Sequence, residues 1–126
     1  MQGNYQAWFE NAQDNLKWAE DNFKDGNFPL VCFLSQQAVE LLLKSCIYSK
    51  DKIPPKTHQL VRLAEFCKQL GFKLNELLPK LAILSEYYLE SRYPDELNRE
   101  LNQKGVAQKA LGFAKEIFEA ILPELC

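Results

Sequence analysis

The chain has 126 residues, and its 47% apolar and 25% charged residues indicate one globular domain rather than a disordered segment. Its 15 basic and 17 acidic residues give a net charge of −2, so no basic excess favours general binding to nucleic acid. The sequence opens without a signal-peptide pattern, and no apolar run reaches the ~20 residues that span a bilayer. We therefore expect a cytoplasmic protein with no membrane partner.

Cysteine and histidine usage excludes the common zinc sites, because the chain has a single histidine and no Cys-x-x-Cys pair. No glycine-rich phosphate loop and no nucleophile elbow occurs either. We therefore expect no metal, no cofactor and no catalytic motif. Cys32, Cys46 and Cys67 are interpreted as small core residues.

Apolar residues recur every three or four positions along the chain, which predicts helices and not strands. A first helix is expected over residues 4–25, followed by Gly26 in a left-handed turn. A second is expected over residues 28–49, with Asn27 as its cap and Pro29 in its first turn. This second helix is apolar around most of its circumference, which is typical of the central helix of a bundle.

Three more helices complete the predicted fold. We expect a shorter helix over residues 58–70, capped by Thr57, and then a long helix from residue 75 or 79 to residue 92. The last helix is expected over residues 106–122 and is ended by Pro123. The sequence leaves open whether residues 95–105 form a helix or a loop. The sum is an all-α, up-and-down bundle of four long helices and one shorter helix, in a single domain over residues 1–126.

The second helix carries an unusual polar arc. Gln36, Gln37, Glu40 and Lys44 share about 100° of its circumference, taking about 100° per residue. Glu40 and Lys44 also have the favourable i, i+4 order for an ion pair. Two interpretations stay open: the arc is the solvated strip of a central helix, or it is a polar groove or interface that positions a ligand or partner.

Two short motifs add further polar candidates. Thr57 suits a helix cap, and His58, the single histidine, suits a packing or capping position beside it. Arg92 and Tyr93 lie at the end of the expected fourth helix, where an arginine is favoured by the helix dipole. The alternative for Arg92 is that its guanidinium binds a carboxylate or phosphate.

These residues resemble the small stand-alone branch of the HEPN family, the higher eukaryote and prokaryote nucleotide-binding domains. The similarity rests on the runs CFLSQQAVELLLK at residues 32–44, THQL at residues 57–60 and RYPD at residues 92–95. They occur in the family's order and span essentially the whole chain. The resemblance implies a five-helix, up-and-down bundle that commonly dimerises and acts as the partner of a small nucleotidyltransferase.

Some HEPN proteins are metal-independent RNases that carry an Arg-x4-6-His motif. This sequence departs from that pattern, because no arginine precedes His58 and no histidine follows Arg92. The RNase activity that the resemblance would otherwise imply therefore lacks its general base.

We accordingly predict a non-catalytic binding module for a nucleotide, a nucleotidyltransferase partner, or both. Gln37 and Glu40 are expected to offer hydrogen bonds, and Lys44 and Arg92 positive charge. The full set of expected binding residues is Gln36, Gln37, Glu40, Lys44, Thr57, His58, Arg92 and Tyr93. The alternatives are a metal-independent RNase and a plain helical interaction protein.

A homodimer is also expected. Large aromatic side chains in so small a chain are better explained by a partner surface than by chance exposure. The residues concerned are Trp8, Trp18, Phe33 and Tyr48.

Overall fold

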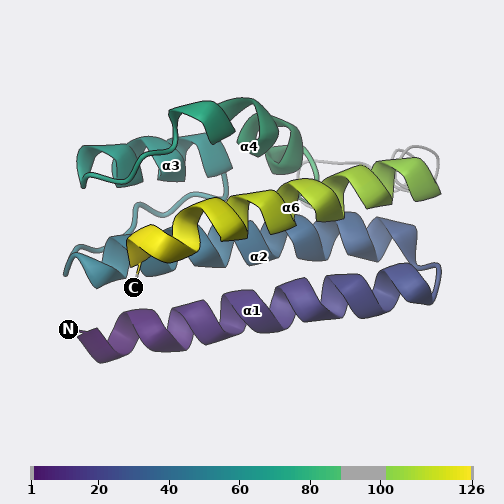
Figure 1. Cartoon of the computed structure of the whole chain (residues 1–126), viewed down its shortest axis with the longest axis horizontal. Helices are drawn as coiled ribbons and strands as arrows, with labels where there is room; N and C mark the ends of the chain where they lie inside the picture. The colour runs from purple at the N-terminus through teal and green to yellow at the C-terminus, as the bar shows by residue number, and fades with distance from the viewer. Residues whose placement is uncertain (1, 89–101, 126) are drawn as a thin grey trace.

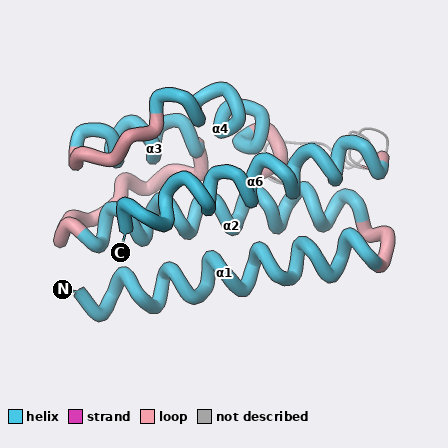
Figure 2. The backbone as a smooth tube through the Cα atoms, in the orientation of Figure 1, coloured by secondary structure: helices cyan, strands magenta, loops and turns pink. Residues whose placement is uncertain are grey.

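The computed structural model describes residues 2–88 and 102–125. That part of the chain contains five α-helices, one short 3₁₀-helix and no strand (Figures 1 and 2). The predicted all-α bundle is thereby confirmed. The elements are α1 (Gln2–Lys24), α2 (Phe28–Ser49), α3 (Leu60–Gln69), η1 (Asn75–Leu77), α4 (Leu78–Ser85) and α6 (Lys104–Leu125).

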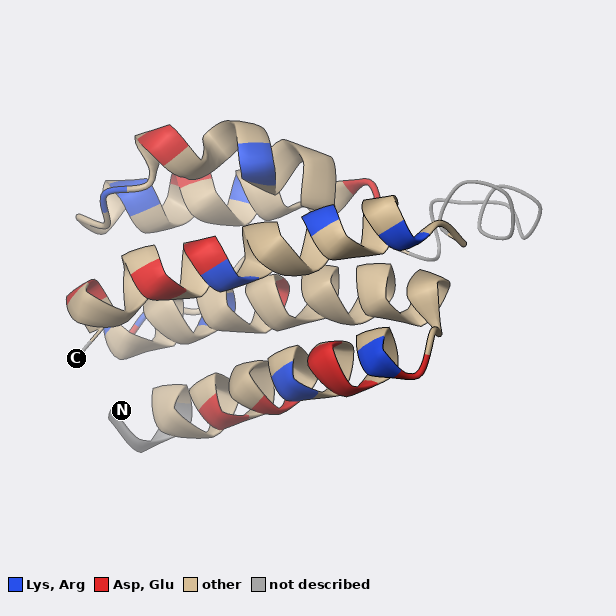
Figure 3. Cartoon of the chain, turned by 45° about the vertical axis from the view of Figure 1, so that its right-hand side comes forward, with Lys and Arg blue, Asp and Glu red and all other residues tan. Residues whose placement is uncertain are grey.

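The predicted central helix is α2. It packs against α1 on one side, against α6 in front, and against the shorter α3 and α4 on a third side (Figure 1). Ala38, Val39 and Leu42 have no exposed surface, as their place on this helix predicts. Most charged residues lie on the surrounding helices, and the ribbon of α2 is mostly uncharged (Figure 3).

Helix α2 is also the single described helix that is long and apolar enough to cross a membrane by length and composition. Burial inside the fold accounts for that character, since 67% of its most apolar window is covered by the rest of the chain. The same burial separates a core helix from a lipid-exposed one.

Local sequence signals determine several helix ends. Gly26 adopts the left-handed conformation predicted for it, with φ +81°, and Gly71 after α3 also has a positive φ, +102°. Asp51 does the same at φ +58° after the end of α2. Asn27 precedes α2 as predicted, but its side chain makes no capping bond and donates instead to the Asn22 amide oxygen at 3.0 Å.

The third helix starts later than predicted. Thr57 Oγ1 accepts from the Gln59 N–H at 3.1 Å, which forms a tight turn, and α3 begins only at Leu60. The Leu60 N–H donates to Ser85 Oγ at 3.0 Å. The prediction that Thr57 caps this helix is therefore wrong, because the Ser85 hydroxyl accepts from the first N–H of α3 instead. His58 consequently lies in the loop that precedes α3.

The fourth helix is shorter than predicted. It ends at Ser85 instead of Arg92, and a turn follows in which the Tyr87 N–H donates to the Leu84 carbonyl at 3.0 Å. The turn lets Tyr88 lie against His58, a contact that helical periodicity does not encode. The described chain therefore has three long helices of 23, 22 and 22 residues and two short ones of 10 and 8. Arg92, Tyr93 and residues 95–101 lie outside the described residues.

The last helix passes through Pro123, which was expected to end it. A proline costs a helix one N–H bond and crowds the carbonyl four residues earlier. Here that cost falls in the final turn, where α6 continues only to Leu125. Leu125 is buried, so packing of this last turn on the core opposes the break.

Candidate functional site

Glu40 is the centre of a buried polar network. Its side chain is 2% exposed and accepts hydrogen bonds from Lys44 Nζ at 2.9 Å and Gln36 Nε2 at 3.0 Å. The predicted ion pair between Glu40 and Lys44 is therefore confirmed. Gln36 has no exposed surface, so the interpretation of the arc as a solvated strip is wrong for Gln36 and Glu40.

His58 joins this network from the loop before α3. Its Nδ1 lies 3.2 Å and 3.1 Å from the two carboxylate oxygens of Glu40. Its backbone carbonyl accepts from Gln36 Nε2 at 3.4 Å. An Nδ1 proton donated to the carboxylate leaves Nε2 as a free acceptor. Since the His58 side chain is 50% exposed, a buried glutamate orients an accessible imidazole.

Tyr88 stacks on His58 with ring centroids 4.1 Å apart and an interplanar angle of 14°. A pocket of about 310 Å³ lies at this stack, lined by Thr57, His58, Gln59, Ser85 and Tyr88. It combines two ring faces with two side-chain hydroxyls beside the imidazole. The predicted residues Thr57 and His58 are thus brought together with Ser85 and Tyr88, which the sequence analysis missed. The spacing of Tyr88 suggested only a helical core position.

Lys44 extends away from that pocket. Its ammonium lies 5.9 Å from the centre of the Trp8 ring, which itself stacks on Tyr48 with centroids 5.1 Å apart. Gln37 makes no hydrogen bond to the Glu40 network, and its buried Oε1 has no partner among the described residues. The residues of the polar arc therefore have different surroundings. Gln36 and Glu40 bind His58, and Lys44 lies between Glu40 and the ring of Trp8. Gln37 is not part of this network.

No group of three or more His, Cys, Asp and Glu side chains that could hold a metal ion occurs within residues 2–88 and 102–125. Glu40 and His58 supply two such groups, and Lys44 occupies the other side of the carboxylate. The chemistry open to the pocket is therefore hydrogen bonding, ring stacking and proton exchange at the imidazole.

The buried thiols confirm their interpretation as core residues. Cys32, Cys46 and Cys67 are free and buried. A hydrogen bond with Cys67 and burial together raise the pKa of the Cys46 thiol far above its usual range. Since the thiolate is the reactive form, Cys46 is chemically inert in the folded protein.

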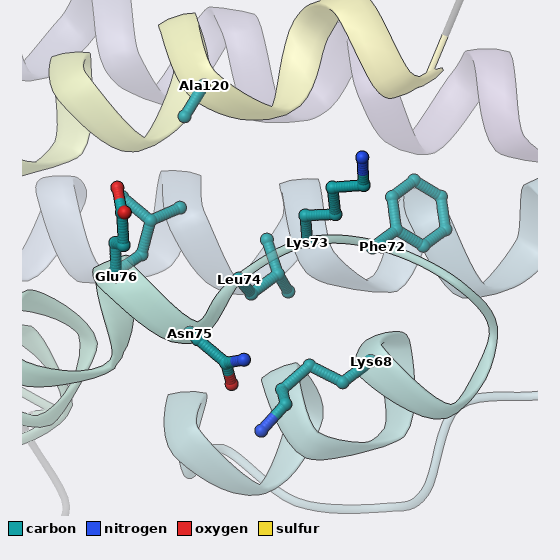
Figure 4. Close-up of a pocket in the computed structure, with 8 residues that line it drawn as sticks. Lys68, Phe72, Lys73, Leu74, Asn75, Glu76 and Ala120 are labelled. Carbon is teal, nitrogen blue, oxygen red and sulfur yellow. The ribbon is translucent and has the colours of Figure 1, made fainter.

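A larger pocket of about 570 Å³ lies at the loop between α3 and η1 and contains none of the predicted residues. The side chains of Lys68 and Lys73 point in different directions from it (Figure 4). Lys68 Nζ also lies 3.5 Å from a Glu65 oxygen, so its charge is partly neutralised. Because its cations do not converge, we place the candidate site at His58 instead.

Comparison with known proteins agrees with this fold. The HEPN domain model matches residues 5–125. Among solved structures, TT1696 from Thermus thermophilus is 25% identical, with full coverage of both chains and a TM-score of 0.86. No curated protein matches the sequence. Since the family model covers nearly the whole chain, this protein belongs to the HEPN domain family.

Proposed function

We propose that this HEPN protein is a non-catalytic binding module that takes a nucleotide at the His58 pocket and partners a small nucleotidyltransferase. The observation that carries the proposal is the His58–Tyr88 stack, anchored from the core by Glu40. A buried anchor beneath a partly exposed ring pair keeps the recognition surface in one geometry before a ligand binds.

The pocket has the chemistry that a nucleobase needs. Ring faces offer stacking, which is worth about 1–3 kcal/mol per base in single-stranded nucleic-acid sites. The hydroxyls of Thr57 and Ser85 and the His58 Nε2 supply donors and acceptors for the base edge or the ribose. A volume of about 310 Å³ also falls at the lower end of ligand pockets, which span roughly 300–1,000 Å³.

The residues of the polar arc take supporting roles in this proposal. Glu40 is 2% exposed and already holds three partners, so it orients His58 rather than touching the ligand. The Lys44 ammonium is bound by Glu40, so its charge is not free for a phosphate. Arg92 remains the proposed phosphate ligand, on the strength of its motif alone.

Calorimetry with ATP and AMP tests the nucleotide site. We expect His58→Ala and Tyr88→Ala each to weaken binding at least about tenfold, equivalent to ~1.4 kcal/mol. Tyr88→Phe is the matched control, since it keeps the ring and should retain binding. If the wild-type protein binds neither nucleotide at millimolar concentration, the small-molecule site is wrong and only the protein-partner function survives.

The partner part of the proposal is supported by family membership and by the small stand-alone branch that the three motifs resemble. Its test is titration of the purified chain with any small nucleotidyltransferase that a neighbouring gene encodes. A stoichiometric complex is the expected result. Absence of a complex, together with a functional nucleotide site, would leave a nucleotide-binding protein without this partner.

A metal-independent RNase is the second candidate, favoured by one observation: His58 and Glu40 form a carboxylate–imidazole pair of the kind that positions a general base. The missing Arg-x4-6-His motif weighs against it. Incubation of the protein with RNA in the presence of EDTA decides the matter. Intact RNA supports a binding module, whereas cleavage that is lost in His58→Ala would identify an enzyme.

A further inference from the structure

The outer side of α1 carries an exposed tryptophan. α1 packs mainly on α2 and lies at the edge of the bundle (Figure 1). Taking about 100° per residue, Phe9 and Leu16, which pack on the core, lie about 160–180° from Trp18 around the helix axis. Trp18 therefore lies on the solvent side, where it is 51% exposed. Packing of the core does not require so large an apolar residue at this position.

The charged residues around Trp18 on this side of α1 are all acidic. Asp14, Asp21 and Asp25 lie within about 60° of Trp18 around the helix axis, and no lysine or arginine of α1 does. Each of the three is partly or largely exposed, and acidic residues recur along the ribbon of α1 (Figure 3). We call this surface the acidic stripe of α1, made of Asp14, Asn15, Trp18, Asp21 and Asp25.

The polar groups of the acidic stripe accept hydrogen bonds. Asn15 Nδ2 donates to the Asn11 carbonyl at 2.8 Å, which leaves the Asn15 amide oxygen for a donor outside the helix. Lys17 lies beside the stripe, with its Nζ 3.8 Å from an Asp21 oxygen, but both side chains are largely exposed and such a pair is weak. The face of the Trp18 ring is also electron-rich. The stripe therefore presents negative charge, an amide oxygen and a ring face.

This combination fits a cationic partner. Its negative charge repels a phosphate backbone, an anionic membrane and a second copy of the same stripe. An arginine suits it better than a lysine, because the planar guanidinium stacks on an aromatic ring and binds a carboxylate through two N–H groups. Tryptophan and arginine are also the side chains that most often dominate the binding energy of protein interfaces.

We propose that the acidic stripe of α1 binds an arginine-bearing segment of a partner protein, with one guanidinium stacked on Trp18 and others paired with the aspartates. The rise from Asp14 to Asp25 is about 16 Å, which about five residues of extended chain span. The loop that carries His58 leads into α3, on the other side of α2 from α1 (Figure 1). The acidic stripe is therefore independent of the nucleotide site.

Calorimetry at low ionic strength tests the surface with hexa-arginine, acetylated and amidated at its ends, and with hexa-lysine as the comparison. We expect hexa-arginine to bind the wild-type protein more tightly than hexa-lysine. Trp18→Ala should weaken the binding of hexa-arginine about two- to fivefold, the effect of an exposed cation–π contact. Because Trp18 is largely exposed, this variant should keep the circular dichroism spectrum of the wild type.

A pair of double variants tests the carboxylates. Asp14→Asn with Asp25→Asn should weaken hexa-arginine binding at least about threefold, since two exposed ion pairs are lost. The matched control is Glu65→Gln with Glu119→Gln, which removes the same charge at exposed positions on α3 and α6 and should bind like the wild type. Equal losses in the two double variants would show attraction to the overall charge and would overturn the stripe.

Fluorescence locates the stacked guanidinium. Trp8→Phe leaves Trp18 as the single tryptophan of the chain. Hexa-arginine should change the emission of this variant more than hexa-lysine does, because the guanidinium lies on the ring. Unchanged emission, or hexa-lysine that binds as tightly as hexa-arginine, overturns the stack on Trp18. A wild-type protein that does not bind hexa-arginine at millimolar concentration overturns the whole proposal.

Discussion

At the scale of single residues, Glu40 accepts the hydrogen bonds that hold Gln36, Lys44 and His58 together. A carboxylate with 2% exposure is stable in a protein interior only when its lone pairs are satisfied. Gln36, Lys44 and His58 supply those bonds from two segments of the chain. The consequence is that one buried residue sets the orientation of the accessible imidazole.

Replacement of this carboxylate measures how much it contributes to the free energy of unfolding. Glu40→Gln removes the charge that Lys44 and His58 share, and we expect a loss of roughly 1.5–3 kcal/mol, the range for hydrogen bonds to charged groups. Asp21→Asn is the matched control, since the pair of Lys17 and Asp21 is also four residues apart but exposed. Such pairs contribute about 0–1 kcal/mol. Urea unfolding of both variants compares the two losses of unfolding free energy. Equal losses would show that the buried Glu40 contributes no more to stability than an exposed carboxylate.

Cys46 gives a second residue-scale expectation, in alkaline solution. Its pKa is raised by the hydrogen bond with Cys67 and by burial, so the folded protein keeps a thiol proton that the unfolded chain releases above pH ~8.5. The unfolded state then binds fewer protons, and the free energy of unfolding falls as pH rises, by up to about 1.4 kcal/mol per pH unit. Below that pH the contribution is fully present. Denaturant titrations from pH 7 to 10 should show a shallower decline in Cys46→Ala, and identical slopes would refute the assignment.

At the scale of elements, α2 organises the molecule because four helices share its surface. Helices α1 and α6 run alongside α2, while the shorter α3 and α4 meet it over a smaller part of its surface (Figure 1). Ion pairs between the outer helices add to this arrangement: Lys115 of α6 lies 3.4 Å from Glu20 of α1, and Lys80 of α4 bonds Glu116 of α6. Packing on α2 accounts for the arrangement of the helices, and the exposed ion pairs contribute little to the stability of the fold.

Truncation of a buried side chain of α2 should therefore lower the stability of the protein. Leu42 has no exposed surface, and we expect Leu42→Ala to lower the free energy of unfolding by about 2–5 kcal/mol, through lost burial and the void that remains. The control is Ile53→Ala, because Ile53 is 81% exposed and surface changes stay within about 0.5 kcal/mol. Chemical denaturation checks both. A loss below ~1 kcal/mol at Leu42 would show that α2 is not central.

At the scale of the whole molecule, the described helices pack around one hydrophobic core. Buried side chains from every α-helix belong to that core, from Ala12 in α1 to Ile121 in α6. A chain with one core unfolds as one unit. The prediction of a single domain over residues 1–126 has this physical basis.

Calorimetry tests that expectation. Thermal unfolding should be a single transition in which the calorimetric and van't Hoff enthalpies agree for the stoichiometry that unfolds. If two copies of the chain associate, as the sequence predicts, the midpoint temperature should also rise with protein concentration, because association stabilises the folded state by mass action. Two separate transitions would contradict the single domain. A midpoint independent of concentration would argue against the dimer.

Local interactions allowed the sequence to determine much of this protein by itself. Apolar periodicity located the long helices, with residues 28–49 placed at the bounds observed for α2, and Gly26, which has no Cβ to oppose a left-handed conformation, located the turn between α1 and α2. The i, i+4 geometry predicted the pair of Glu40 and Lys44. These features arise from contacts between residues a few positions apart, so the local sequence is enough to predict them.

Only the tertiary structure decided how the candidate site is assembled. Ser85 satisfies the first N–H of α3, Tyr88 leaves its helix to stack on His58, and Glu40 reaches the imidazole from another helix. Each contact joins segments at least 18 residues apart, and helical periodicity carries no information about such distances. The burial of Glu40 follows from the same cause, because the loop before α3 covers the part of the arc that contains Gln36 and Glu40, which α2 alone would expose to water.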